Sequence, residues 1–282
     1  MGINKPMNKL AAQVFSALLI LLLPSGAGWA LDKTLGVIQP GEYPVVLVSN
    51  HLPETFKNSE AYWESLQKVE LETGGPYSFR DLPKLGMKQP FMGAISLGDE
   101  PRKFGVIVDL WGEEKRLYVD TDGDGSFQNE PWRPLLNQWY GLRIYWVESP
   151  EPVELRVPYK DRPGQSFPLQ ILVSGMLNKP GPFFKEKPYL RVLVRSWFLG
   201  KIIEDGAGKY LAIVDRNNNG RFNDPEDGLY LDYNDDSFFA DEELILRKSE
   251  VKLKGKSPDA RAPASFTVSW GVYPDKVVIG GK

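Results

Sequence analysis

Short apolar runs separated by Gly, Pro, Asn and Asp constrain the fold of this 282-residue chain more than any other feature. Several runs alternate apolar and polar residues, as in residues 142–147, and this period of two is typical of strands with one buried face. The chain contains 27 Gly and 23 Pro, which suits many turns better than long helices. We therefore expect a mainly β protein. The expected strands are Val45–Val48, Gly105–Asp109, Arg116–Asp120, Leu142–Val147, Val153–Val157, Leu169–Ser174, Leu190–Trp197, Tyr210–Asp215, Leu229–Asp232, Leu244–Arg247, Val251–Lys254, Ser265–Trp270 and Lys276–Ile279.

One segment, from Ser59 to Leu71, is predicted to be helical. Ser59 is a suitable N-cap residue, because its hydroxyl can accept a hydrogen bond from a backbone N–H of the first turn. Glu60 and Glu64 follow early in the segment, where the helix dipole favours negative charge.

The chain also resembles itself at offsets of about one hundred residues, with the matches in the same order in both halves. We interpret this as a degenerate tandem duplication. The Pro- and Gly-rich stretch from Leu177 to Pro182 is suited to a linker between the halves. We predict two tandem duplicated β-sandwich or barrel-like domains, at residues 31–178 and 179–282. The matching segments are Lys103–Asp109 with Lys209–Asp215, Leu117–Asp120 with Leu229–Asp232, Val153–Arg156 with Val251–Lys254, and Ser166–Phe167 with Ser265–Phe266.

Residues 1–30 have the parts of a secretory signal peptide. Lys5 and Lys9 are the charged residues of this segment, an apolar stretch runs from Leu10 to Leu23, and small residues precede the expected cleavage site after Ala30. As a helix the apolar stretch would span about 21 Å, which is short of the ~30 Å hydrocarbon core of a membrane. We therefore expect a secreted protein, extracellular or periplasmic, with no membrane span after cleavage.

The composition excludes several classes of protein. The chain has no Cys, which excludes disulfides, thiol catalysis and thiolate zinc sites. Its formal net charge is −3 and its pI is about 5.5, which argues against a broadly basic nucleic-acid-binding protein. An exported domain without disulfides must gain its stability from the size of its core or from bound metal.

Three segments place oxygen-bearing side chains at alternate positions, each directly after an expected strand. They are Asp120–Glu130, Asp215–Glu226 and Asp232–Glu243, here called the first, second and third loops. A hard cation such as calcium takes six to eight oxygen ligands at about 2.4 Å. Side chains at loop positions 1, 3 and 5 can converge on one ion only if the backbone turns tightly, and a glycine at position 6 permits that turn because it accepts positive φ.

These segments resemble EF-hand-type calcium loops with the DxDxDG pattern, as also found outside true EF-hands in secreted bacterial β proteins. The resemblance covers about 35 of the 282 residues and identifies no specific family. True EF-hands have a helix on each side of the loop, whereas expected strands enter these loops. Pro131 and Pro225 also oppose a regular helix at the exit. The resemblance therefore implies strand-loop calcium sites.

The resemblance implies different ligand sets in the three loops. Position 12 of the first loop is Pro131, so Glu130, one residue earlier, is the expected closing ligand. The second loop has Asn at positions 3 and 5 and should bind more weakly than the first. In the third loop Ser237 replaces the glycine of position 6. The implied ligands are Asp120, Asp122, Asp124 and Glu130 in the first loop, Asp215, Asn217, Asn219 and Glu226 in the second, and Asp232, Asn234, Asp236 and Glu243 in the third.

Together these features predict a secreted, non-enzymatic protein whose bound calcium stabilises its β domains and orders an interaction surface. Extracellular calcium modules bind with dissociation constants of roughly 10⁻⁴–10⁻³ M. At free calcium tenfold above that constant, each site adds about 1.4 kcal/mol to the free energy of unfolding. A structural role is therefore favoured over a switch.

Three alternatives stay open. A carbohydrate-binding module would use Trp132, Trp139 and Tyr140 as a stacking platform, while Trp146, which alternates with apolar residues, is expected in the core. A secreted glycan hydrolase would need a pair of catalytic carboxylates that the sequence does not single out. A calcium-stabilised subunit of a surface filament or layer is the third, and its partner would be another surface protein.

Overall fold

The computed structural model describes residues 37–49, 65–74, 77–100, 102–110, 113–140, 144–178, 186–237, 239, 243–246, 251–256 and 263–281. All of these belong to one compact unit, Asp32–Lys282. The predicted signal peptide at residues 1–30 lies outside the described residues. Within the described ranges the protein is mainly β with antiparallel sheets, as predicted, and no helix there is long and apolar enough to cross a membrane.

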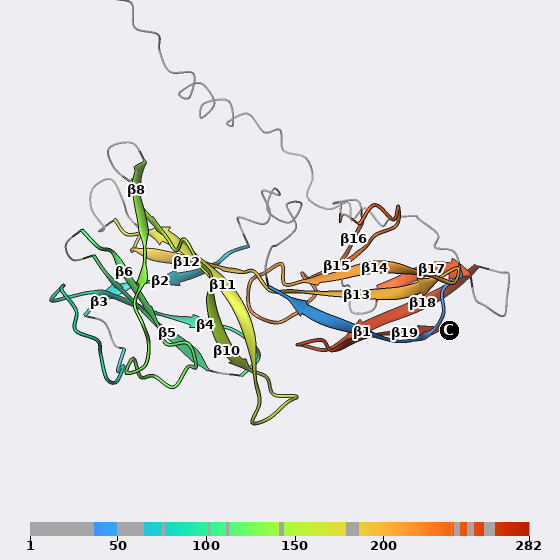
Figure 1. Cartoon of the computed structure of the whole chain (residues 1–282), viewed down its shortest axis with the longest axis horizontal. Coiled ribbons are helices and arrows are strands. Elements are labelled where there is room, and N and C mark those ends of the chain that lie inside the picture. The colour runs from blue at the N-terminus through green and yellow to red at the C-terminus, as the bar shows by residue number, and fades with distance from the viewer. Residues whose placement is uncertain are drawn as a thin grey trace, which may run out of the picture. The chain divides into compact units, whose positions relative to one another are not determined.

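The largest sheet among the described residues has eight strands, in the order β16-β15-β14-β13-β1-β19-β18-β17. The N-terminal strand β1 lies between β13 and β19 and pairs antiparallel with both, so this sheet joins strands from opposite ends of the chain (Figure 1). The strands are β1 Gly41–Val48, β13 Trp197–Glu204, β14 Ala207–Val214, β15 Gly228–Leu231, β16 Leu244–Leu246, β17 Val251–Lys256, β18 Pro263–Trp270 and β19 Lys276–Gly281.

Two further sheets contain the middle of the chain. The six-stranded sheet has the order β2-β12-β11-β9-β8, with β10 also paired to β11, and the five-stranded sheet has the order β3-β4-β5-β6-β7. The six-stranded sheet comprises β2 Gln67–Glu70, β8 Leu136–Tyr140, β9 Ile144–Glu148, β10 Val153–Pro158, β11 Ser166–Met176 and β12 Tyr189–Val194. The five-stranded sheet comprises β3 Glu72–Thr73, β4 Phe91–Ser96, β5 Lys103–Asp109, β6 Arg116–Val119 and β7 Arg133–Pro134.

The main hydrophobic core contains side chains from all three sheets. Phe104 of β5, Leu190 of β12 and Phe198 of β13 are each almost completely buried in it. Along β11 the buried residues alternate with half-buried ones, because successive side chains of a strand point to opposite faces. The period-two pattern of the sequence therefore has its structural cause in this core.

The predicted strands all overlap observed strands in their described parts, but two predictions need correction. The run Leu190–Trp197 is two strands, β12 and β13, because Arg195 and Ser196 leave the ladder. The Arg195 N–H donates to the carbonyl of Gln170, and the Ser196 hydroxyl accepts the Gln170 N–H.

The helix predicted for Ser59–Leu71 is wrong over its last part, where Gln67–Glu70 forms β2. Val69 is buried and β2 pairs with β12, so tertiary pairing overrides the local helix signal. Residues 59–64 lie outside the described ranges.

The segments matched in the sequence occupy similar places in the topology. The four antiparallel strands β4-β5-β6-β7 are neighbours in that order, and so are β13-β14-β15-β16. The hairpin of β10 and β11 likewise corresponds to the hairpin of β17 and β18. Strand β1, however, pairs within the eight-stranded sheet, and β12 pairs within the six-stranded sheet. A division at residue 178 thus stays a prediction.

Candidate metal centre

The three acidic loops each begin at the residue that follows a buried strand. The first loop follows β6, the second connects β14 to β15, and the third connects β15 to β16. The residue at position 1 is a completely or almost completely buried aspartate in each case. These aspartates are Asp120, Asp215 and Asp232.

The backbone makes the same turn in all three loops. Positions 4 and 6 both have positive φ, between 57° and 79°, a conformation in which Gly, Asn and Asp are enriched. Ser237 of the third loop has φ 62°, so the loop keeps the turn although it lacks the glycine of the pattern. The residues with positive φ are Gly123 and Gly125 in the first loop, Asn218 and Gly220 in the second, and Asp235 and Ser237 in the third.

Hydrogen bonds to the aspartate at position 1 hold this turn. In each loop its Oδ2 accepts the backbone N–H of position 6, at 2.7 to 3.0 Å. The side-chain oxygen of position 3 accepts the N–H of position 5, at 3.1 to 3.3 Å. The donors at position 6 are Gly125, Gly220 and Ser237, and the acceptors at position 3 are Asp122, Asn217 and Asn234.

A later carboxylate closes each loop by accepting the backbone N–H of position 2. The distances are 2.7 Å in the first loop, 3.1 Å in the second and 2.9 Å in the third. The closing carboxylate is not at a constant position, so the number of residues between the turn and the closure varies. The pairs are Thr121 with Glu130, Arg216 with Asp227, and Tyr233 with Glu243.

Three predicted ligands of the first loop converge. Carboxylate oxygens of Asp120, Asp122 and Glu130 all lie within 4.8 Å of one another. Asp124, the fourth, is exposed and its Oδ1 accepts the Ser126 N–H at 2.6 Å. Burial raises the pKa of Asp120, against the lowering effect of the N–H groups of Gly125, Gly123 and Gly105. A bound cation would lower the pKa of Asp120 again, since it stabilises the charged form of the carboxyl group.

Two arginines hold the outside of the first loop. Arg80 Nη2 donates to the carbonyl oxygen of Asp124 at 2.8 Å, and Arg102 Nη1 donates to that of Asp122 at 3.0 Å. The apolar residue at position 8, Phe127, is buried. The first loop is therefore anchored from both sides, which keeps its carboxylates in place.

The second loop has a different interior. Asp224 is buried, and its Oδ2 accepts hydrogen bonds from the side-chain amides of Asn217, at 3.3 Å, and Asn219. Its Oδ1 forms an ion pair with Arg221 Nη2 at 2.8 Å. Glu226, the predicted closing ligand, is exposed. The structure thus brings Asp215, Asn217 and Asn219 into one loop but leaves Glu226 at its surface.

Two buried carboxylates of the second loop have strongly raised pKa values. Burial raises the pKa of Asp215 to about 7, although backbone N–H groups of Gly220, Asn219 and Asn218 oppose the shift. Burial, with the nearby charge of Asp215, raises the pKa of Asp227 to about 8. The two groups interact, and they resist being charged together.

The third loop contains a buried oxygen without a hydrogen-bond partner. Asp232 is completely buried, and its Oδ1 accepts no hydrogen bond from the described residues, whereas its Oδ2 accepts the Ser237 N–H. Asn234 and Asp236 at positions 3 and 5 are joined by a side-chain hydrogen bond of 3.0 Å. A buried carboxylate oxygen without a donor is costly, and a cation at this point would satisfy it.

Sequence reasoning missed Asp224 and Asp227. Three acids follow Phe222 in the second loop, and counting positions from an EF-hand template selects Glu226 among them. Asp227 directly precedes β15, whose residues are all buried. This position next to an apolar run could have indicated that Asp227 is the buried acid of the three.

Two of the aromatic residues considered for glycan binding, Trp132 and Trp139, have ring contacts in the described part of the structure, and the glycan-binding hypothesis stays a prediction. Trp132 and Trp139 are exposed, by 43% and 60%. The Trp139 ring contacts Tyr145 at a centroid distance of 4.9 Å with planes tilted by 53°, and the Arg116 guanidinium lies over Trp132 at 5.2 Å. The side chain of Tyr140 lies outside the described part of the structure.

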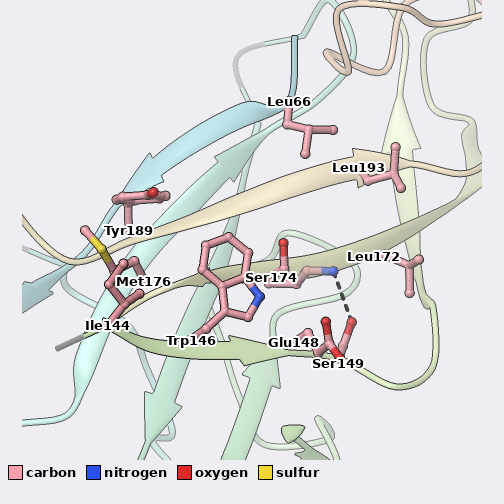
Figure 2. Close-up of a pocket in the computed structure, with 11 residues that line it drawn as sticks. Leu66, Ile144, Trp146, Glu148, Ser149, Leu172, Ser174, Met176, Tyr189 and Leu193 are labelled. Carbon is pink, nitrogen blue, oxygen red and sulfur yellow. Dashed lines mark hydrogen bonds between the residues drawn. The ribbon is translucent and has the colours of Figure 1, made fainter. Parts of the chain in front are cut away.

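A pocket of about 530 Å³ lies on the six-stranded sheet, and its described lining residues include none from the three loops (Figure 2). Trp146, expected in the core, instead lines this pocket in a cross-strand row with Met176 and Tyr189. Its wall is mostly apolar, and Glu148 is the one carboxylate among its described lining residues. The glycan-hydrolase hypothesis, which requires a pair of carboxylates, stays a prediction.

Comparisons with protein-family models, with curated proteins and with solved structures found no significant match to the chain.

Proposed function

We propose that the chain is an exported, non-enzymatic calcium-binding protein, built from two duplicated β domains, whose acidic loops bind calcium and thereby stabilise the fold. The convergence of Asp120, Asp122 and Glu130 within 4.8 Å is the observation that carries the proposal. Three carboxylates this close repel one another. A divalent cation between them would attract each carboxylate and outweigh their mutual repulsion.

The chemistry of the donors favours calcium over other divalent metals. The side chains at positions 1, 3 and 5 of the three loops present oxygen, from carboxylates and amides, and the chain has no Cys. Oxygen-only sites suit magnesium, calcium and manganese, and flexible loops with several carboxylates suit calcium, which accepts six to eight ligands without strict geometry.

The third loop supports the same proposal independently. The unpartnered Oδ1 of buried Asp232 lies in a loop with the same turn and the same closing hydrogen bond as the first. A cation would give that oxygen a partner, although the described carboxylates of the third loop do not converge as those of the first loop do. The similar strand order of β4-β5-β6-β7 and β13-β14-β15-β16 supports the duplication, because the first and third loops follow the corresponding strands β6 and β15.

Thermal unfolding in excess calcium and in excess chelator tests the proposal. Each occupied site should add about 1.4 kcal/mol at free calcium tenfold above its dissociation constant. The double variant Asp120→Asn/Asp232→Asn should lose most of the calcium-dependent shift in the unfolding midpoint. Glu151→Gln, which removes an exposed carboxylate outside the loops, is the matched control and should keep the full shift.

An unfolding midpoint that is the same with calcium and with chelator would sink the proposal. A shift that persists in the double variant would show that calcium binds elsewhere. Magnesium in place of calcium provides a further check, since a flexible, many-oxygen loop should respond less to magnesium, which demands near-octahedral geometry.

A further inference from the structure

The second loop contacts strands of both other sheets, through its own backbone and one buried side chain. Asn218 is completely buried, and its Oδ1 accepts the backbone N–H of Val194 at the end of β12 at 2.8 Å. The carbonyl of Asn219 accepts the N–H of Gly98, after β4, at 2.8 Å. The carbonyl of Gly220 accepts the hydroxyl of Tyr159, after β10, at 2.6 Å.

These contacts are close as well as directional. A Cβ added to Gly220 would lie 2.9 Å from the backbone nitrogen of Gly98 and 2.9 Å from the Cβ of Leu97. Glycine is therefore needed at position 220 for two reasons: the turn requires φ 76°, and the backbone of the second loop packs directly against the backbone of Gly98. The loop that the sequence presents as a metal site is also a packed joint of the fold.

A partly exposed cationic side chain already pairs with the buried carboxylate of this loop. Arg221 Nη2 lies 2.8 Å from Asp224 Oδ1, and the amides of Asn217 and Asn219 donate to Asp224 Oδ2. Asp224 thus receives donors on both oxygens. In the third loop Lys209 Nζ donates to the carbonyl of Tyr233 at 2.9 Å and to Asp235 Oδ2 at 2.8 Å, but the Oδ1 of buried Asp232 has no donor among the described residues.

The charges at the ligand positions differ in the same direction. Positions 1, 3 and 5 contain three carboxylates in the first loop and two in the third, but only Asp215 in the second. Fewer carboxylates weaken calcium binding. An arginine that is already paired opposes it further, since a calcium ion would have to displace or tolerate that guanidinium.

We propose that the second loop is a docking loop that joins the eight-stranded sheet to the other two sheets without a bound metal ion, with Arg221 and the amides of Asn217 and Asn219 in the place of the ion. The calcium count in this inference rests on the proposed function, whereas the docking role does not. The inference departs from the sequence-based expectation that all three loops bind calcium.

Calorimetric titration with calcium tests the count. The parent chain should bind two ions, and Asn217→Ala/Asn219→Ala should still bind two. The matched variant of the third loop, Asn234→Ala/Asp236→Ala, should bind one. Loss of one ion in Asn217→Ala/Asn219→Ala would overturn the inference and leave the proposed function standing, whereas a parent that binds no calcium would overturn the proposed function.

Hydrogen exchange read by mass spectrometry tests the docking role, whatever the calcium count. Peptides that contain Gly98 and Val194 should exchange at the same rate in chelator and in excess calcium. Asp224→Ala should speed their exchange about tenfold in chelator, which corresponds to about 1.4 kcal/mol, while Asp122→Ala in the first loop should not.

Two results would overturn the docking role. One is protection of these peptides that appears only with calcium, which would make the joint metal-dependent. The other is an Asp224→Ala variant with unchanged exchange, which would mean that the Asp224 network does not hold the loop. If Asp224→Ala fails to fold, the comparison of the parent in chelator and in calcium still decides.

Discussion

The first and second loops share one backbone turn but have different interiors. Both start from a buried aspartate, have positive φ at positions 4 and 6, and close with a carboxylate that accepts the N–H of position 2. In the first loop three carboxylates converge, whereas in the second an arginine and two amides surround one carboxylate. The same turn therefore surrounds a buried aspartate with different side chains in the two loops, and on our proposal this difference decides whether a metal ion binds.

Asp109 and Asp215, which end matching strands in the two halves of the chain, differ in the backbone groups that they bind. Asp109, at the end of β5, is buried and accepts the N–H groups of Gly86 and Met87, at 2.8 and 3.1 Å. Asp215, after β14, instead accepts N–H groups of its own loop. In both places a buried aspartate at a strand end thus anchors backbone N–H groups, of a neighbouring segment for Asp109 and of its own loop for Asp215.

The largest difference between the loops should appear when their position-6 glycines are replaced. Gly220→Ala forces an alanine into φ 76° and brings its Cβ to 2.9 Å from Gly98 nitrogen, so we expect a loss of about 3 kcal/mol. Gly125→Ala has φ 79° but no neighbour within 4 Å, so we expect about 1 kcal/mol. Urea unfolding in chelator measures both.

Equal losses for the two glycine variants would contradict the view that the second loop is the packed joint. Gly164→Ala, with φ 76° and no neighbour within 4 Å in a turn outside the loops, gives the cost of the backbone conformation alone.

The pH dependence of the metal-free protein should arise mainly from the second loop. Asp215 and Asp227 have pKa values of about 7 and about 8 in the folded protein, above the value of 3.8 for an unperturbed aspartate. Between about pH 4 and pH 8 the unfolded chain releases these protons before the folded one does. The free energy of unfolding in chelator should therefore fall as pH rises through this window.

Asp227→Asn should flatten this pH dependence, because it removes one member of the interacting pair. Asp120→Asn in the first loop should flatten it less, since the rise in the pKa of Asp120 is smaller than the rises for Asp215 and Asp227. A free energy of unfolding that rises with pH over the same window would contradict the assignment. The measurement is a series of urea unfolding curves in chelator.

The closing carboxylates offer a comparison of calcium affinity. Glu130→Gln keeps an oxygen that can accept the Thr121 N–H but removes a charge from the converging group, so calcium affinity should fall about tenfold. Glu226→Gln, at an exposed position of the second loop, should leave every calcium affinity unchanged. Calorimetric titration compares the two variants, and an effect of Glu226→Gln equal to that of Glu130→Gln would restore Glu226 as a ligand.

The sequence predicted strands that alternate toward a core, such as β10, and strands that are short apolar runs, such as β15, but it missed β4 and β8. It could not predict that β1 pairs with β13 and β19, since register between distant segments depends on the whole sheet. The turns of the loops were predictable from Gly125 and Gly220, because positive φ favours glycine. Asp227 was missed because the closing acid lies at different distances from the turn, and only the path of the chain selects it.

The smallest expected difference concerns the two arginines beside the loops. Arg221 is partly exposed and pairs with buried Asp224 at 2.8 Å, so Arg221→Met should cost about 1 kcal/mol in chelator. Arg80 and Asp124 are more than half exposed and 3.8 Å apart, so Arg80→Met should cost less than about 0.5 kcal/mol.

Arg221→Met also removes the cationic group that occupies the second loop and leaves Asp224 available. It should therefore create a weak additional calcium site, detectable by titration at millimolar calcium, which Arg80→Met should not. A second loop that stays unresponsive to calcium after loss of Arg221 would mean that the amides alone exclude the ion.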